Sequence, residues 1–201
     1  LDSPIKISPQ LSKLKIIGQG SDKVNIKGSK KLNLNWKKFK DSIWVTKVKD
    51  NANFDQLFIN HKQQILARYP NYDENGGHWQ GHAEDAISPK RVSAWKNPKG
   101  AIVHAMHSGE WGDFHYVISD VKKNGEVKLT GGQQNNRPSP LHKTYRMVEN
   151  VFEELDSPGE WYFDKDKKLL YYWPEYGINL KNALVEGIYL KSLIEIIGDK
   201  D

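Results

Sequence analysis

Two long polar segments carry the side chains of this sequence that are best suited to chemistry. Segment 72–85 reads YDENGGHWQGHAED and segment 130–142 reads TGGQQNNRPSPLH. A sugar offers hydroxyls to amides, carboxylates and guanidinium groups, and weakly apolar C–H faces to tryptophan. Together with HSGEWGDFH, the two segments supply both kinds of group. The candidate carbohydrate-binding residues are Trp79, Gln80, His82, Asp85, Glu110, Trp111, Asn135, Asn136 and Arg137.

An alternative role for these polar residues is local. Segments of this length without regular structure are usually either functional or mobile. Their amides, together with Arg137, could instead satisfy the backbone groups of the loops themselves. The sequence leaves both interpretations open.

Three carboxylates are candidates for acid–base catalysis at a glycosidic bond, namely Glu84, Asp85 and Glu110. Hydrolysis of such a bond needs two carboxyl groups about 5–10 Å apart, and the sequence does not place these three in space. The motifs Gly-x-Ser-x-Gly, Gly-x4-Gly-Lys-Ser/Thr and His-Glu-x2-His do not occur, which argues against esterases, nucleotidases and metalloproteases. We assign no catalytic residue and do not expect the isolated chain to be an enzyme. A self-contained glycoside hydrolase that uses Glu110 and Asp85 is the alternative.

The histidines do not form a metal motif. Six of the seven lie between His78 and His142. Residues at positions i and i+3 of a strand point to opposite faces, so His104 and His107 of AIVHAMH cannot both bind one metal ion unless the strand ends between them. The chain has no cysteine, which excludes disulfides, thiolate metal sites and thiol catalysis. We expect neither a metal nor a cofactor.

Charge is unevenly distributed along the chain. Residues 1–50 contain 12 Lys and 4 Asp, a balance of +8, so the remaining 151 residues carry −3 of the net +5. The lysines mostly alternate with apolar residues, as on the solvent side of a strand, and form no cluster with arginine or aromatic residues. We therefore expect no nucleic-acid partner. No apolar run approaches the roughly 20 residues of a membrane span, and LDSPIKISPQ indicates a trimmed chain, either a mature secreted protein or a piece of a larger one.

The middle of the chain has the pattern of a mainly β domain. Residues 43–48 alternate apolar and polar, and LFINHKQQILARYP predicts a hairpin with its turn at Asn60-His61. Residues 101–107, 114–121 and 126–131 predict further strands, with a tight turn at 124–125. EWYFD and LLYYWP predict a hairpin with apolar or aromatic residues on both faces, which is typical of a strand covered on both sides. Short helices are expected from Ser88 to 97 and within MVENVFEEL.

The two ends of the chain resemble each other. LKIIG at 14–18 and IEIIG at 194–198 share the order apolar, charged, Ile, Ile, Gly, and short β-like runs fill residues 5–34. Closely spaced short strands with a recurring motif suggest rungs of a β-solenoid. The alternative is that both ends are strands of one ordinary sheet. The solenoid interpretation divides the chain into a rung remnant at 1–35, an inserted β-sandwich domain at 36–182 and a second rung remnant at 183–201.

Three segments carry a family resemblance. FDQLFINHKQQILARYPNYD, LDSPGEWYFDKDKKLLYYWP and LIEIIGDKD resemble parts of secreted bacterial right-handed parallel β-helix proteins, a group that includes pectate-lyase-like enzymes and glycoside hydrolases. The resemblance extends from about Leu11 onward, and PGEWYFD with LYYWP is its most specific part. His61 departs from the glycine expected in that hairpin turn.

The resemblance implies a mainly β fold in which a β-sandwich-like domain, with one or two short helices, interrupts a solenoid. It implies an accessory domain that shapes the glycan groove of an exported carbohydrate-active protein. The partners would be a polysaccharide or oligosaccharide and the rest of the parent chain. Family members keep their catalytic carboxylates on the long face of the solenoid, so no catalytic residue is carried over. A purely structural or protein-binding module is a further alternative.

Overall fold

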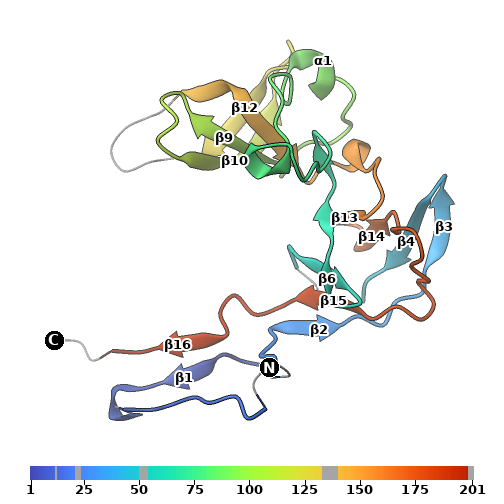
Figure 1. The fold of residues 1–201 in the computed structure, drawn as a ribbon. Coiled ribbons are helices and arrows are strands. Elements are labelled where there is room, and N and C mark those ends of the chain that lie inside the picture. The colour runs from blue at the N-terminus through green and yellow to red at the C-terminus, as the bar shows by residue number, and fades with distance from the viewer. Residues whose placement is uncertain (12, 21–23, 50–53, 133–139, 199–201) are drawn as a thin grey trace.

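The structure, a computed structural model, describes residues 1–11, 13–20, 24–49, 54–132 and 140–198, and within them the fold is mainly β (Figure 1). The described strands form four sheets, one of which has only two strands. Within these described residues, helical structure is limited to α1 (Pro89–Val92) and the single 3₁₀ turns η1 (Pro9–Leu11), η3 (His78–Gln80) and η4 (Phe152–Glu154). The strands are β1 (Ile5–Ile7), β2 (Ser29–Lys31), β3 (Lys37–Lys40), β4 (Ile43–Lys47), β5 (Leu57–Ile59), β6 (Lys62–Gln63), β7 (Ile65–Leu66), β8 (Arg68–Tyr69), β9 (Ile102–His107), β10 (Asp113–Val121), β11 (Val127–Gly131), β12 (Leu141–Glu149), β13 (Glu160–Asp164), β14 (Leu169–Tyr172), β15 (Val185–Ile188) and β16 (Ile194–Ile196).

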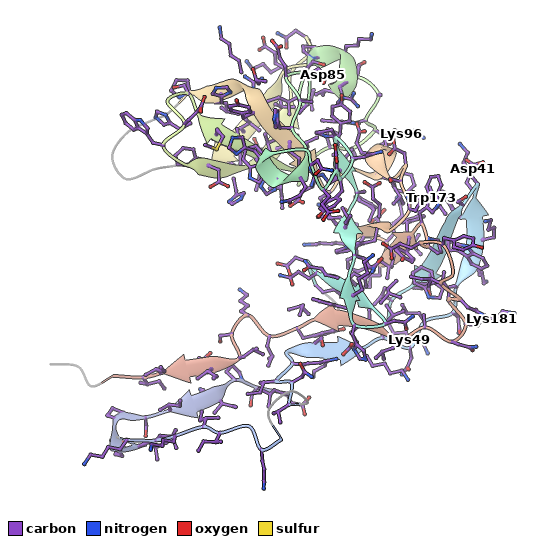
Figure 2. All side chains as sticks on the ribbon, viewed as in Figure 1. Asp41, Lys49, Asp85, Lys96, Trp173 and Lys181 are labelled. Atoms are coloured by element: carbon purple, nitrogen blue, oxygen red, sulfur yellow. The ribbon has the colours of Figure 1, made fainter. Side chains whose placement is uncertain are left out.

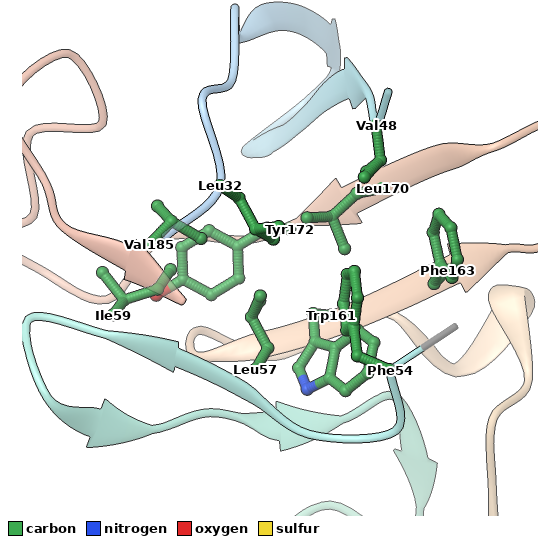
Figure 3. Close-up of a cluster of buried hydrophobic side chains, with 10 residues drawn as sticks. All are labelled: Leu32, Val48, Phe54, Leu57, Ile59, Trp161, Phe163, Leu170, Tyr172 and Val185. Atoms are coloured by element: carbon green, nitrogen blue, oxygen red, sulfur yellow. The ribbon is translucent and has the colours of Figure 1, made fainter. Parts of the chain in front are cut away.

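Two sheets share a hydrophobic core and form the expected β-sandwich. One has the order β3-β4-β14-β13-β7 and the other the order β2-β15-β5-β6. Side chains from both sheets meet between them, as Figure 3 shows. Burial of apolar surface in such a core is the main force that stabilises a β-sandwich. The buried residues of this core are Leu32, Val48, Phe54, Leu57, Ile59, Trp161, Phe163, Leu170, Tyr172 and Val185.

The aromatic hairpin β13–β14 is covered on both faces, as its sequence predicts. The strands pair antiparallel, with Trp161 opposite Tyr172. Trp161 and Tyr172 are 1% and 0% exposed in the sandwich core. Tyr171 points to the opposite face and packs in a second cluster with Leu155 and Ala67. The rings of this hairpin are therefore mostly core residues.

A third sheet, with the order β11-β10-β9-β12-β8, lies above the sandwich in Figure 1 and packs against α1. The three strands predicted within residues 101–131 are confirmed as β9, β10 and β11. Gly125, at φ 84°, lies in the turn between β10 and β11, where a positive φ suits glycine. The core of this sheet includes Val103, Ile118 and Val148, which are fully buried.

The two expected helices are shorter than their sequences suggest. α1 is capped as predicted, because the Ser88 hydroxyl accepts a hydrogen bond from the Arg91 amide, but only Pro89–Val92 are α-helical. The helix expected within MVENVFEEL is wrong for its first half, because Met147 and its neighbours form the end of β12. Pairing of β12 with β9 satisfies the backbone groups of these residues, so only η4 is helical.

The chain ends meet in a two-stranded sheet of their own. β1 pairs parallel with β16, and Ile5 lies opposite Ile194. Figure 1 shows these two strands side by side, extending away from the sandwich. The expected β-like runs at 14–18 and 24–28 form no strand ladder, so the two similar motifs do not pair with each other.

Candidate functional site

A cleft of about 1170 Å³ lies between the third sheet and the strands β6, β7 and β13. Most of the residues that line it are polar or charged, and they include part of the segment 72–85 that the sequence singles out. A concave site lined by converging polar groups is the usual form of a small-ligand or saccharide site. The charged, imidazole, phenol and loop-amide side chains along it are Asp55, Gln56, Lys62, Gln64, Arg68, Tyr72, Glu74, Gln80, His104, His115, Glu149, Glu160 and Glu175.

One wall of the cleft carries a histidine–carboxylate array. His104 on β9 lies directly opposite His115 on β10, and their rings meet edge to face at 4.5 Å. His104 Nε2 is 3.0 Å from Glu149 Oε1, on β12. Alternation along β9 explains this wall, because Val103 and Ala105 face the core under α1 while His104 faces the cleft. The array groups two imidazoles and a carboxylate that can exchange hydrogen bonds with sugar hydroxyls.

Hydrogen bonds from Arg68 hold part of segment 72–85 in place. Its guanidinium donates to three backbone carbonyls, those of Pro70 (2.8 Å), Trp79 (2.7 Å) and Gly81 (2.9 Å). Arg68 is buried, and this burial lowers the pKa of its guanidinium. The planar Arg68 guanidinium thus bonds both ends of residues 70–81 and holds this stretch in place.

The tip of the same segment is closely packed backbone. A Cβ added at Gly76 would come within 2.7 Å of the Gly81 amide nitrogen, so only glycine fits there. Trp79 and Gln80 both adopt positive φ, at 51° and 54°. Non-glycine residues in this conformation concentrate at functional sites and tight turns. The Trp79 indole donates to the Asp113 carboxylate at 3.1 Å, which fixes its ring near His104.

Asp85 takes part in an anchor beside α1 (Figure 2). Its carboxylate accepts from the Tyr69 hydroxyl at 3.0 Å and from the Arg91 guanidinium at 3.3 Å. Arg91 also lies over the Tyr69 ring and pairs with Glu154. Burial, and then the hydrogen bond to Asp85, raise the pKa of Tyr69. These contacts give Asp85 a structural role in attaching α1 to the sheet.

Glu110 and Trp111 lie at the turn between β9 and β10. Trp111 is 73% exposed, and its ring stacks on His107 at 5.1 Å with an interplanar angle of 9°. Glu110 Oε1 is 3.4 Å from His142 Nε2. Glu110 and Asp85 have different partners, His142 for Glu110 and Arg91 for Asp85.

The remaining candidate residues lie in different places, and some of them are outside the described residues. His82 packs edge-on against Tyr145 at 4.7 Å, and its Nδ1 atom is buried without a hydrogen-bond partner among the described residues. Asn135, Asn136 and Arg137 lie outside the described residues. Of the nine candidates, Gln80 lines the cleft itself, and Trp79 lies beside its histidine wall.

Glu160 is a cleft residue that sequence reasoning missed. It is 1% exposed, and its Oε2 atom accepts from the amides of Asp156 and Ser157 at 3.1 Å each. Its Oε1 atom has no partner among the described residues. Burial raises the pKa of this carboxyl to about 8, although the two amide hydrogen bonds act in the opposite direction. The available signal was a carboxylate within PGEWYFD, on a strand with apolar residues on both faces.

Two further classes of site find no support in the described part of the chain. No group of three or more His, Asp or Glu side chains there has the arrangement of a metal site. No helix in the same ranges is long and apolar enough to cross a membrane.

The comparisons with known proteins identify a fold but no family. No family model and no curated protein matches the sequence. A solved structure described as "Glycoside hydrolase" matches 99% of this chain with a TM-score of 0.70 and 21% sequence identity. The matched region is 38% of that protein, so this chain spans well under half of its length. The likeness establishes that the mainly β fold described above also occurs as part of that larger protein.

Proposed function

We propose that this chain is an accessory β-sandwich domain inserted into an exported, carbohydrate-active, right-handed parallel β-helix protein of bacterial type. In this proposal the terminal strands β1 and β16, within the segments 1–35 and 183–201, belong to adjacent solenoid rungs, and the chain between them is the insertion. β2 and β15, at the inner ends of the same segments, are strands of the inserted sandwich. The domain shapes the glycan groove of the parent protein and contacts its polysaccharide. The partners are that glycan and the rest of the parent chain.

The parallel pairing of β1 with β16 is the observation that carries the proposal. Successive rungs of a solenoid stack as parallel strands in register, with like residues above one another. Ile5 lies opposite Ile194 and Ile7 opposite Ile196, although they come from opposite ends of the chain. An insertion between two neighbouring rungs produces this arrangement, because the strand before the insertion and the strand after it become neighbours.

Exposed apolar residues near the terminal pair support the same proposal. Ile17 and Ile196 are each 80% exposed, and Ile197 is 49% exposed. A single pair of rungs cannot bury its own apolar face, and further rungs would cover it. β2 and β15 lie at the inner ends of the two terminal segments and pair with each other, and β15 also pairs with β5. They would attach the sandwich to the solenoid.

The glycan role rests on the cleft and on the fold comparison. The cleft is concave and lined by hydrogen-bonding groups, and the fold is shared with part of a protein described as a glycoside hydrolase. Gln80 of segment 72–85 lines this cleft, and the Trp79 ring lies beside His104 at its wall. Export is proposed from the resemblance to secreted β-helix proteins.

Affinity electrophoresis of the chain through gels that contain single polysaccharides tests glycan contact. We expect retardation by at least one neutral or charged glycan, and reduced retardation for Trp79→Ala. Tyr176→Ala is the matched control, because Tyr176 is fully exposed and is not among the cleft residues. Absence of retardation across a wide panel would refute the glycan role.

A turnover assay on the same panel distinguishes an accessory domain from an enzyme. The proposal expects no hydrolysis by the isolated chain. Hydrolysis that is abolished by Glu110→Gln or Asp85→Asn would contradict the accessory role and favour a self-contained glycoside hydrolase.

A further inference from the structure

The charge of the cleft differs in sign from the charge of the chain. The whole sequence carries +5, but five of the cleft residues are carboxylic acids and only two, Lys62 and Arg68, are permanent cations. With a pKa of about 8, Glu160 is mostly protonated at neutral pH, which leaves four carboxylates facing two cations. The cleft is therefore an acidic site on a basic protein.

Both cations of the cleft already have partners. Lys62 Nζ is 2.6 Å from the Glu175 carboxylate. Arg68 directs its guanidinium at the carbonyls of Pro70, Trp79 and Gly81. Neither is available to pair with a carboxylate of a ligand without giving up these bonds. An acidic ligand in the cleft would meet carboxylates without an available counter-charge.

Three carboxylates of the cleft form no hydrogen bond or ion pair with a lysine or arginine side chain within the described residues. Asp55 and Glu74 make none at all there. Glu149 is bonded to the His104 imidazole and lies opposite Arg68 in the β12–β8 ladder, where its charge acts on the Arg68 guanidinium. Tyr72, which lines the same cleft, is 48% exposed and offers a ring for a sugar face. The site thus combines free acceptors of positive charge with an exposed aromatic ring.

Glu160 provides an independent indication of a ligand. Its Oε1 atom is buried at the cleft and has no partner among the described residues. Buried polar atoms are nearly always satisfied, by protein, water or ligand. Because Oε2 accepts from the two amides, the protonated carboxyl carries its hydrogen on Oε1, and a hydroxyl oxygen of a bound sugar would satisfy it.

We propose that this cleft is a subsite for oligosaccharides that carry amino sugars, and that it rejects polyuronates. Asp55, Glu74 and Glu149 attract the sugar ammonium groups, and Tyr72 contacts a sugar face. The inference rests on the proposed function and adds the class of glycan. Non-specific attraction by the basic chain as a whole would give the reverse order of affinities, with the polyuronate bound best.

Three hexasaccharides test the proposal by isothermal titration calorimetry at low salt and about pH 6.5. They are a β-1,4-linked glucosamine hexamer, whose amines still carry protons at this pH, its fully N-acetylated neutral counterpart, and hexagalacturonate. We expect the glucosamine hexamer to bind about three- to tenfold more tightly than the neutral hexamer, and hexagalacturonate to bind most weakly. The preference should shrink at about 0.5 M salt, where exposed charge pairs are screened.

Variants connect the preference to the cleft. Glu74→Gln and Glu149→Gln should each reduce the preference for glucosamine about two- to fivefold. Glu126→Gln is the matched control, because Glu126 is exposed, pairs with Lys122 and is not among the cleft residues. It should leave the preference unchanged. Since Glu74 is exposed in a loop, its variant should fold normally, which circular dichroism checks.

The outcomes separate this inference from the proposed function. Binding of hexagalacturonate as strong as that of glucosamine, or equal binding of the two β-1,4 hexamers, overturns the amino-sugar assignment but leaves the accessory glycan role intact. A preference that Glu126→Gln removes as much as Glu74→Gln also overturns it. Failure of all three ligands overturns it as well, and only a negative result across the wider panel refutes the glycan role.

Discussion

The β13–β14 hairpin and the β1–β16 pair differ in how far their side chains are buried. Both consist of short strands rich in large apolar side chains. In the hairpin, Trp161 is 1% exposed, because one face packs on a second sheet and the other on the cluster around Tyr171. In the terminal pair, Ile196 is 80% exposed, and Figure 2 shows side chains of these strands projecting into open space. Burial therefore depends on whether a second layer covers the strand, and of these two pairs only the hairpin has one among the residues that the structure describes.

Because of this difference in burial, the hairpin and the terminal pair contribute unequally to the folding free energy. Apolar area removed from water contributes roughly 25 cal/mol per Å², so the hairpin and its two clusters contribute far more to the folding free energy than the terminal pair does. The terminal pair has few neighbours and contributes little. The sandwich should therefore fold without the terminal pair, whereas the pair should gain order only when further rungs cover it.

Trp161→Ala should have the largest effect on the free energy of unfolding, and it tests whether the hairpin is part of the sandwich core. The substitution leaves a large cavity beside Phe54, whose ring lies 5.8 Å from the Trp161 ring. We expect a loss of about 3–5 kcal/mol in the free energy of unfolding, measured by urea denaturation. Tyr176→Ala, at a fully exposed ring, should change it by less than about 0.5 kcal/mol. Equal effects of the two substitutions would mean that the hairpin is not core.

Arg68→Lys should have the next largest effect. Lysine keeps the positive charge but cannot donate to three carbonyls in the geometry of a guanidinium. We expect a loss of about 2–4 kcal/mol and faster amide exchange in residues 70–81. Arg91→Lys offers a comparison, since the Arg91 guanidinium bonds the carboxylates of Asp85 and Glu154 instead of backbone carbonyls. If residues 70–81 keep their protection in Arg68→Lys, the guanidinium does not organise this segment.

Glu160 predicts a pH dependence of stability. A carboxyl whose pKa is raised to about 8 in the folded state contributes its full stability below the unfolded value of about 4.5 and loses it as pH rises through 8. Unfolding free energies at pH 5 and 9 should therefore differ more in the wild type than in Glu160→Gln, by on the order of 1–3 kcal/mol. Glutamine mimics the protonated acid and still accepts from the Asp156 and Ser157 amides. Identical pH profiles for the two proteins would show that Glu160 is ionised in the folded state.

Ile196→Ser should have the smallest effect on the free energy of unfolding, and it tests whether the terminal pair lies outside the core. Ile196 is 80% exposed, so its replacement removes little buried apolar surface. We expect a change below about 0.5 kcal/mol in the free energy of unfolding. Ile59→Ser, at a residue 1% exposed in the sandwich core, is the matched control and should cost several times more. A large loss for Ile196→Ser would indicate that the terminal pair is part of the core.

Local signals in the sequence predicted the hairpins but not their partners. The turn at Asn60-His61 and the turn at Gly125 follow from residue types that tolerate positive φ, and both form as predicted. The parallel pairing of β13 with β7, and the pairing of β15 with β5, join distant segments and depend on the whole fold. Short apolar runs such as residues 14–18 have strand propensity without a partner, and so form no ladder.

The candidate site was predicted only in part for the same reason. Segment 72–85 stands out by composition, and it places Trp79 and Gln80 at the cleft wall or its edge. In the sequence, Arg68 and Glu160 are a single cation and a single carboxylate within strand-like segments, and nothing there indicates their roles. Their roles arise from three carbonyls, two amides and a cleft that only the folded chain brings together. Asp85 stays a predicted binding residue, and the contacts of its carboxylate with Tyr69 and Arg91 beside α1 were not predictable from composition.

Amide hydrogen exchange of the isolated chain tests the central claim most directly. The account predicts that amides paired within β13 and β14 exchange at least about a hundredfold more slowly than those that join β1 to β16, because the terminal pair lacks a covering layer. Protection of the β1–β16 amides equal to that of the hairpin would contradict it. The terminal strands would then be integral members of a self-contained domain, and the proposed insertion between solenoid rungs would fail.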